Sequence, residues 1–64
     1  MRNRVKAERL TQGMTQVELA QKAHVARGVI SGLENGTREV ITTDTMQKIA
    51  DALSKKVSDL FFLT

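Results

Sequence analysis

The stretch from Thr15 to Gly36, TQVELAQKAHVARGVISGLENG, decides the fold, because it has the pattern of two short helices joined by a tight turn. Its apolar residues fall where two helices crossing at a steep angle would face each other: Leu19, Ala20, Ala23, Val25, Ile30 and Leu33. Ala20 is small, which lets the second helix approach the first closely. The second helix also carries four residues spaced i, i+1, i+4 and i+5, namely Arg27, Gly28, Ser31 and Gly32. This spacing places them on one outward stripe, which is the candidate functional surface.

Local signals set the boundaries of these two helices. Thr15 is followed three residues later by Glu18, the spacing of a capping box, in which each side chain satisfies a free backbone N–H of the other residue. The first helix therefore spans 16–23, and the second spans 27–34 and ends before Gly36, since glycine tolerates the positive φ common after a helix. The two glycines of the stripe each weaken the second helix by about 1 kcal/mol relative to alanine. Two explanations stay open: close approach to a partner, or drift on a tolerant surface.

The rest of the chain predicts three further helices around this pair. Residue 13 is a glycine suited to end the first of them, and Thr42 is a candidate N-cap for the second. The second also has a clear buried stripe at i, i+3, i+4 and i+7, formed by Met46, Ile49, Ala50 and Leu53. The expected helices span 2–12, 43–53 and 57–62. We therefore expect an all-α fold, a compact five-helix domain that comprises residues 1–64 as a single unit.

Composition limits the function classes that need to be considered. With 64 residues, one domain buries only about 60% of the surface that its unfolded chain exposes. The chain has no cysteine, which leaves neither a disulfide framework nor a thiolate zinc site. No run approaches the ~20 apolar residues of a membrane span, and the amino terminus lacks the apolar core of a signal peptide. We therefore expect a cytoplasmic protein without a membrane partner.

An enzyme is not expected. The chain has one histidine, His24, and no cysteine, tyrosine or glycine-rich phosphate loop, and no carboxylate pair has a base in reach. A lone histidine is far more often structural or merely exposed than catalytic or metal-binding. We thus expect no catalytic residue, no metal and no cofactor, and a chain this short leaves no room for a small-molecule pocket.

The charges are distributed unevenly along the chain. Ten basic and seven acidic residues give a net charge of +3. Residues 1–27 hold six basic and two acidic residues, whereas 28–64 hold four basic and five acidic residues. A basic amino-terminal half that includes the candidate surface favours a polyanionic partner. An ordinary solvated surface would explain the charges equally well.

The arrangement resembles the helix-turn-helix of the phage repressor and Cro class, also called the XRE class, over nearly the whole chain. The matching segments are Asn3-Arg4-Val5-Lys6 with Arg9, Gly13-Met14-Thr15-Gln16, Glu18-Leu19-Ala20, Ile30, Leu33-Glu34-Asn35-Gly36 and Lys48-Ile49-Ala50-Asp51-Ala52-Leu53. This resemblance implies a lambda-repressor-like DNA-binding fold. It also implies a positive φ at His24, where the class usually has glycine, and a partly buried ion pair between Arg9 and Glu34.

The resemblance further implies a sequence-specific regulator of transcription, most simply a repressor, that binds double-stranded DNA with helix 27–34 in the major groove. The base-reading residues would be Arg27, Gly28, Ser31 and Gly32. Arg27 is the first choice for direct readout, because its planar fork matches guanine O6 and N7. The phosphate contacts would come from Gln16, Asn35, Thr37, Arg38 and Arg2.

The carboxyl end carries two apolar residues, Phe62 and Leu63, for which two roles stay open. In relatives without a separate oligomerisation domain this region commonly makes a two-fold contact, which implies a homodimer on a pseudo-palindromic operator with half-sites about 34 Å apart. The alternative is an antitoxin or anti-repressor-like module whose apolar end binds a partner protein. Either protein would be bacterial or phage-encoded, and the regulator would be associated with the nucleoid.

Overall fold

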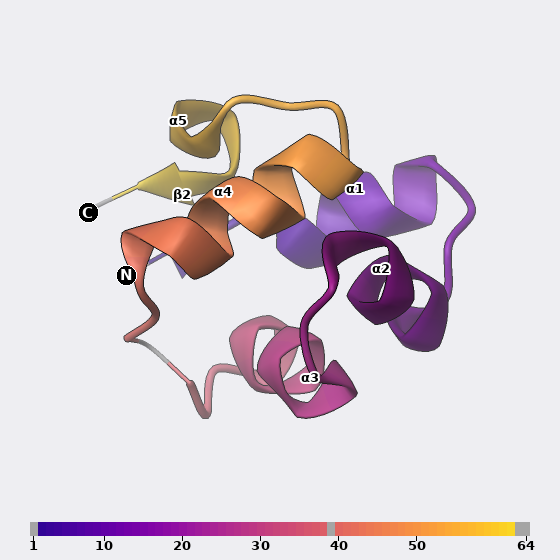
Figure 1. The fold of residues 1–64 in the computed structure, drawn as a ribbon, viewed down its shortest axis with the longest axis horizontal. Helices are drawn as coiled ribbons and strands as arrows, with labels where there is room; N and C mark the ends of the chain where they lie inside the picture. Colours follow the sequence, from indigo (N-terminus) through magenta and orange to yellow (C-terminus); the bar gives the residue numbers. More distant parts are fainter. Residues whose placement is uncertain (1, 39, 63–64) are drawn as a thin grey trace.

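Five helices and two short strands make up the part of the chain that the computed structural model describes, residues 2–38 and 40–62 (Figure 1). In chain order they are β1 (Arg2–Asn3), α1 (Val5–Thr11), α2 (Gln16–Ala23), α3 (Arg27–Asn35), α4 (Thr43–Ala52), α5 (Val57–Leu60) and β2 (Phe61–Phe62). The predicted helical class is confirmed, with the strand pair as a minor addition. Within these residues, no helix has both the length and the apolar character needed to cross a membrane.

The two ends of the chain differ from the sequence-based expectation. The first helix was predicted over 2–12, but Arg2–Asn3 form a strand that pairs antiparallel with Phe61–Phe62. The fifth helix therefore ends at Leu60 instead of continuing to 62. A backbone hydrogen bond of 2.8 Å from the Arg4 N–H to the Leu60 carbonyl extends this pairing. The strands form because α1 and α5 bring the two termini side by side.

The predicted capping signals are confirmed. The Thr15 hydroxyl accepts a hydrogen bond from the Glu18 N–H at 3.0 Å, and the Glu18 carboxylate accepts one from the Thr15 N–H at 2.9 Å. The Thr42 hydroxyl accepts from the Thr45 N–H at 3.1 Å and begins α4. His24 adopts the left-handed conformation that the resemblance implies, with φ of 58°.

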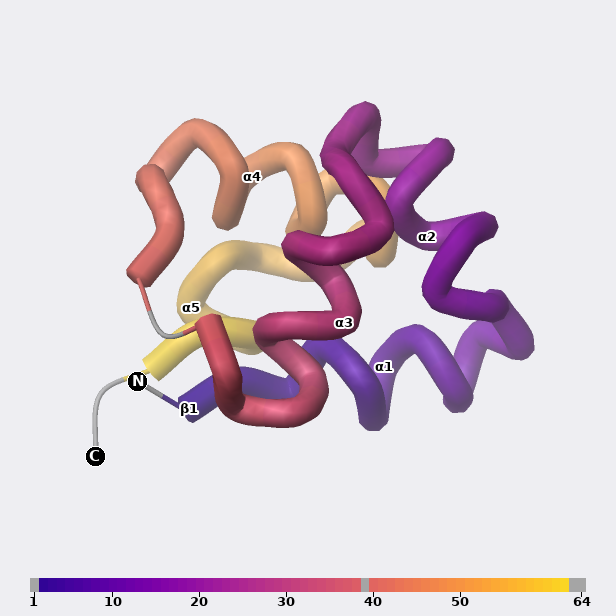
Figure 2. Tube along the Cα trace, turned by 90° about the horizontal axis from the view of Figure 1, so that it is seen from below, coloured from indigo at the N-terminus to yellow at the C-terminus, as the bar shows by residue number. Residues whose placement is uncertain are grey.

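The core lies where α2 packs against α3 and α4, closed at one end by α1 and α5. The buried apolar residues come from all five helices and β2: Val5, Leu19, Ala20, Ala23, Ile30, Leu33, Ile49, Ala50, Ala52, Leu53, Leu60 and Phe61. Figure 2 is viewed from the side on which α3 lies, and it shows α3 across the centre with β1 and α1 along one side of it. One side of α3 therefore faces the core while the opposite side remains open.

Candidate nucleic-acid interface

The open side of α3 carries three of the four residues of the predicted stripe. Arg27 and Gly28 are exposed and Ser31 is half-buried, but Gly32 is buried, which corrects its expected place on the outward stripe. The chain turns back after α3, and the Arg38 N–H donates a hydrogen bond of 3.0 Å to the Gly32 carbonyl. A spacing rule for one helix cannot detect a loop that returns to cover it.

The two glycines of α3 consequently have different roles. A Cβ on Gly32 would lie 2.8 Å from the Cβ of Arg38 and 3.5 Å from the Thr37 hydroxyl, so Gly32 is needed for the loop to pack on the helix. A Cβ on Gly28 would meet nothing within 4 Å. Gly32 is therefore explained neither by close approach to a partner nor by drift on a tolerant surface. Close approach to a partner still fits Gly28, which has open space beside it.

A buried ion pair ties the end of α3 to α1. The Arg9 guanidinium donates from Nε to Glu34 Oε2 at 2.7 Å and from Nη2 to Glu34 Oε1 at 2.9 Å. Its Nη1 donates to the Met14 carbonyl at 2.7 Å. The two side chains are only 9% and 4% exposed. The bidentate geometry therefore fixes α3 relative to α1 and to the start of α2.

Gln16 connects this ion pair to the outward stripe. Its amide Nε2 donates to Glu34 Oε1 at 3.2 Å, and its Oε1 accepts from Arg27 Nη2 at 3.4 Å. Because an amide nitrogen has two hydrogens, Gln16 retains one donor for a further acceptor. No sequence pattern predicts that Arg27 and Gln16 meet, because their contact depends on how α2 packs against α3.

The protonation state of Glu34 follows from its neighbours. Burial alone raises the pKa of the Glu34 carboxyl, but the hydrogen bonds from Arg9 and Gln16 and the charges of Arg9 and Lys6 outweigh it. The net effect is a pKa below the ordinary value of the group. The same pairing raises the pKa of Arg9. Both side chains are therefore charged at neutral pH.

The expected phosphate-binding residues lie at two places around α3. Asn35 and Thr37 form a turn in which Asn35 Oδ1 accepts from the Thr37 N–H at 3.0 Å and from its hydroxyl at 2.7 Å. The Asn35 carbonyl oxygen is thus used, while its NH₂ group has no hydrogen-bond acceptor among residues 2–38 and 40–62. Arg2 lies in β1 with its guanidinium carbon 5.9 Å from the ring centre of Phe62.

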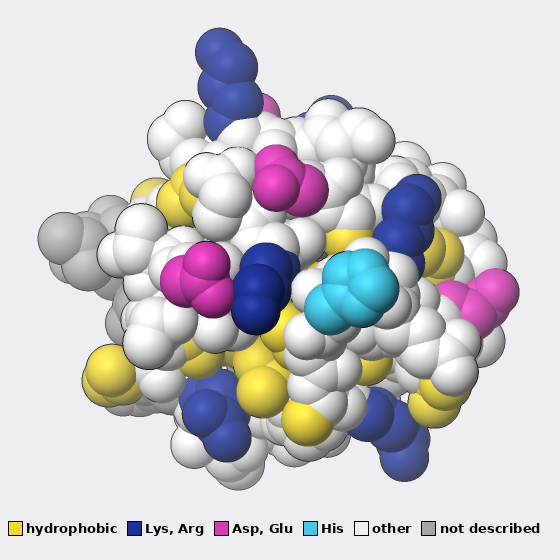
Figure 3. Space-filling model, in the orientation of Figure 1, with side chains coloured by type: hydrophobic (Ala, Val, Ile, Leu, Met, Phe, Trp, Pro, Cys, Tyr) yellow, Lys and Arg dark blue, Asp and Glu magenta, His cyan; other side chains and the backbone are white. Residues whose placement is uncertain are grey.

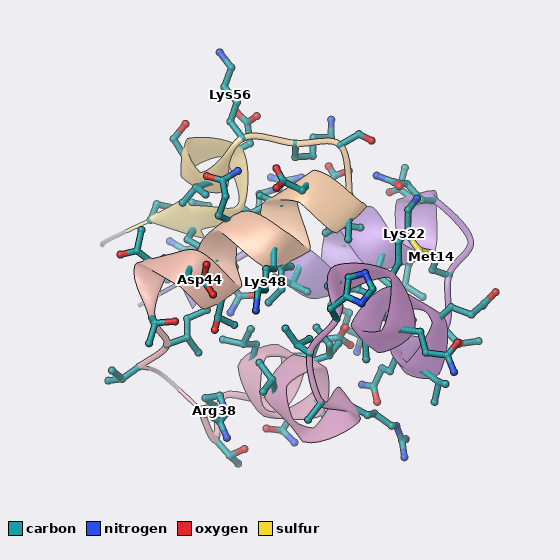
Figure 4. All side chains as sticks on the ribbon, viewed as in Figure 1. Met14, Lys22, Arg38, Asp44, Lys48 and Lys56 are labelled. Carbon is teal, nitrogen blue, oxygen red and sulfur yellow. The ribbon has the colours of Figure 1, made fainter. Side chains whose placement is uncertain are left out.

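Arg38 is the remaining residue expected to bind phosphate around α3. Figure 4 shows Arg38 on the loop that follows α3, on the same side of the molecule as α3, whereas Lys56 extends from the opposite side. On the face drawn in Figure 3, basic and acidic side chains are mixed around α4, whereas the lower edge over α3 shows basic side chains without acidic ones. The surface around α3 is therefore suited to an anionic partner.

Two further expectations concern the rest of the molecule. Phe62 is half-buried, and Leu63 lies outside the described residues. Among residues 2–38 and 40–62, no group of three or more His, Cys, Asp or Glu is placed to hold a metal ion. His24 is exposed in the turn between α2 and α3.

Known proteins with this arrangement are similar to the chain in sequence and in structure. The family model for helix-turn-helix proteins matches residues 5–60. The restriction-modification controller protein C.AhdI from Aeromonas hydrophila is 31% identical over 91% of this chain and 86% of its own, with a TM-score of 0.83. A mutant of the restriction-modification controller protein C.Esp1396I is 36% identical over 81% of this chain and 66% of its own, with a TM-score of 0.74. A search of curated proteins found no match.

Proposed function

Because the chain belongs to the XRE-type helix-turn-helix family of DNA-binding transcription regulators, we propose that it binds a specific double-stranded operator with α3 in the major groove. The observation that carries this proposal is the open side of α3, where Arg27 and Gly28 are exposed and Ser31 is half-buried. The basic groups on either side of α3 support the same orientation, because DNA phosphates flank the major groove on both sides.

Each residue of this surface has a role that its chemistry supports. Arg27 opens α3 and would donate from its planar guanidinium to guanine O6 and N7, while Ser31 supplies a shorter and less selective hydroxyl. Gln16 holds Arg27 in the free protein and has one amide hydrogen left for a phosphate oxygen. The NH₂ group of Asn35 and the guanidinium of Arg38 would contact phosphates beyond the carboxyl end of α3.

One long base-reading side chain gives limited specificity, so the proposal includes a homodimer. Two copies related by a two-fold axis would bind a pseudo-palindromic operator and double the number of contacts. The half-buried Phe62, with Leu63 beyond the described residues, is the proposed contact between the copies. The two solved proteins named above are controllers of restriction-modification systems, which supports a regulatory role for this chain. The proposed action is repression, with the concentration of the protein setting occupancy of the operator.

The assignment of Arg27 is tested with the variant Arg27→Ala on the operator and on operators changed at single base pairs. One bidentate arginine contributes about 1–3 kcal/mol of discrimination, so the variant should lose preference at one base pair in each half-site. Lys22→Ala is the matched control, because it removes one exposed positive charge from α2. If Arg27→Ala weakens binding to all sequences equally, Arg27 contacts phosphate and the assignment is wrong.

The homodimer is tested by the mass of the protein, free and bound to the operator, in wild type and in Phe62→Ala. We expect two protein copies on each operator, and weaker pairing in the variant. A carboxyl end that binds a different protein instead of a second copy would favour the antitoxin or anti-repressor-like module.

A further inference from the structure

The most exposed of the large apolar side chains in the described part of the chain lies beside α3. Val40 is 86% exposed, compared with 56% for Leu10 and 45% for Val17. A single exposed valine is ordinary on a protein surface, so its position is what matters. Val40 borders a hollow of about 450 Å³ whose other lining residues are Gly28, Gly32, Thr37 and Arg38.

Val40 gives this hollow one apolar wall, Thr37 and Arg38 line it with polar groups, and the part over Gly28 lacks side chains. Gly28 has open space where a Cβ would stand, so an outside group can approach the backbone of α3 closely. The Arg38 N–H donates a hydrogen bond of 3.0 Å to the Gly32 carbonyl, which holds Arg38 against α3 at one side of the hollow. The hollow therefore lies open to solvent next to the outward stripe, with which it shares Gly28.

The chemistry of the major groove limits what can fill such a site. Base edges there present hydrogen-bond donors and acceptors, and the methyl group on C5 of thymine is the apolar group among them. Cytosine methylated at C5 carries the same group at the same place. Val40 beside the bare backbone of Gly28 suits a methyl group, whereas Thr37 and Arg38 on the rest of the lining suit polar atoms.

We propose that the hollow between Gly28 and Val40 receives a pyrimidine 5-methyl group in the major groove, which makes Val40 a specificity-determining residue. This inference rests on the proposed function, because it requires α3 to lie in the groove. Arg38, on the polar lining, then contacts a phosphate next to the methylated base. The contact reads the methyl group and is indifferent to whether thymine or 5-methylcytosine carries it.

The test replaces each thymine of the operator in turn with uracil, which differs from thymine in the absence of the 5-methyl group. At one position in each half-site, wild-type affinity should fall about fourfold, the change expected for one buried methyl group. In Val40→Ala the same replacement should change affinity less than about twofold. Leu10→Ala, which shortens an exposed apolar side chain on α1, is the matched control and should keep the wild-type response.

A second arm identifies the source of the methyl group. At the sensitive position, thymine is replaced by cytosine and then by 5-methylcytosine. Recovery of affinity on methylation supports a site that accepts either base. A uracil effect without such recovery would contradict the claim that either base is accepted. Melting temperatures should be equal for wild type and Val40→Ala, because the side chain is exposed in the free protein.

Two results would overturn the inference and leave the proposed function standing. In one, an operator is bound specifically but no uracil replacement costs more than twofold. In the other, the uracil effect is the same in Val40→Ala as in wild type. Absence of any preferred DNA sequence would be a different outcome, since it would contradict the proposed function itself.

Discussion

Replacing Arg9 with alanine should remove a large part of the stability of this domain, and the contacts of Arg9 set the size of the loss. The change deletes two hydrogen bonds to Glu34 and one to the Met14 carbonyl. It leaves the Glu34 carboxylate, whose side chain is 4% exposed, with Gln16 as its remaining side-chain donor. Breaking one side of a buried ion pair costs about 3–5 kcal/mol, because the other charge stays buried without its partner.

This loss is large relative to the total free energy of unfolding of the domain. A domain of this size has an unfolding free energy of about 3–10 kcal/mol. Since 1 kcal/mol shifts the melting temperature of so small a domain by about 4–8 °C, we expect a decrease of roughly 12–40 °C. Thermal and urea unfolding, followed by circular dichroism, measure both quantities on the same samples.

Two variants make the measurement specific to the ion pair. Arg2→Ala is the matched control, because Arg2 is exposed and its contact with the Phe62 ring is worth only about 0.5–1 kcal/mol. The double variant Arg9→Met with Glu34→Leu removes both charges and should be more stable than Arg9→Ala. Equal melting temperatures for Arg9→Ala and Arg2→Ala would refute the reasoning, as would a double variant no more stable than Arg9→Ala.

Three further predictions follow from local geometry. The depressed pKa of Glu34 means that its stabilising contribution is present above the ordinary glutamate value of about 4.3 and is lost as pH falls through the lower pKa of the folded state. Urea unfolding at a series of pH values should show this acid loss in wild type and a flatter profile in Glu34→Gln. Gly28→Ala should raise stability by about 1 kcal/mol, whereas Gly32→Ala should lower it, because its Cβ would lie 2.8 Å from Arg38 Cβ; equal changes in melting temperature would contradict this. His24→Gly should raise the melting temperature, since a non-glycine residue at φ of 58° costs roughly 1–2 kcal/mol, and an unchanged value would argue against strain at the turn.

Much of the fold could be predicted from the sequence because its signals are local. The capping box of Thr15 and Glu18 depends on residues three apart, and the buried stripe of α4 depends on helical spacing alone. His24 in the left-handed conformation was implied by the resemblance, since the class usually has glycine there. Such features need no knowledge of how distant segments meet.

The features that sequence reasoning missed depend on distant segments. The strands at residues 2–3 and 61–62 are two residues long, so they have no periodicity, and they form only after the helices bring the ends together. The burial of Gly32 needs the loop after α3 to return to the helix. The exposure of Val40 cannot be predicted from a pattern of apolar residues, because it depends on where the loop after α3 lies.

In the candidate site too, local spacing predicts some features, while others depend on contacts between distant segments. The four-residue spacing placed Arg27, Gly28 and Ser31 on the open side of α3, as helix geometry requires. The contacts from Gln16 to Glu34 and to Arg27 join α2 to both ends of α3, and no spacing within one helix specifies them.

The most direct test of the central claim is selection of bound DNA from a random pool, repeated at two salt concentrations. We predict enrichment of one two-fold-symmetric sequence, with half-sites about 34 Å apart and an affinity that falls steeply as salt rises. Binding that depends on salt but enriches no sequence would contradict a specific operator and leave only a basic surface around α3.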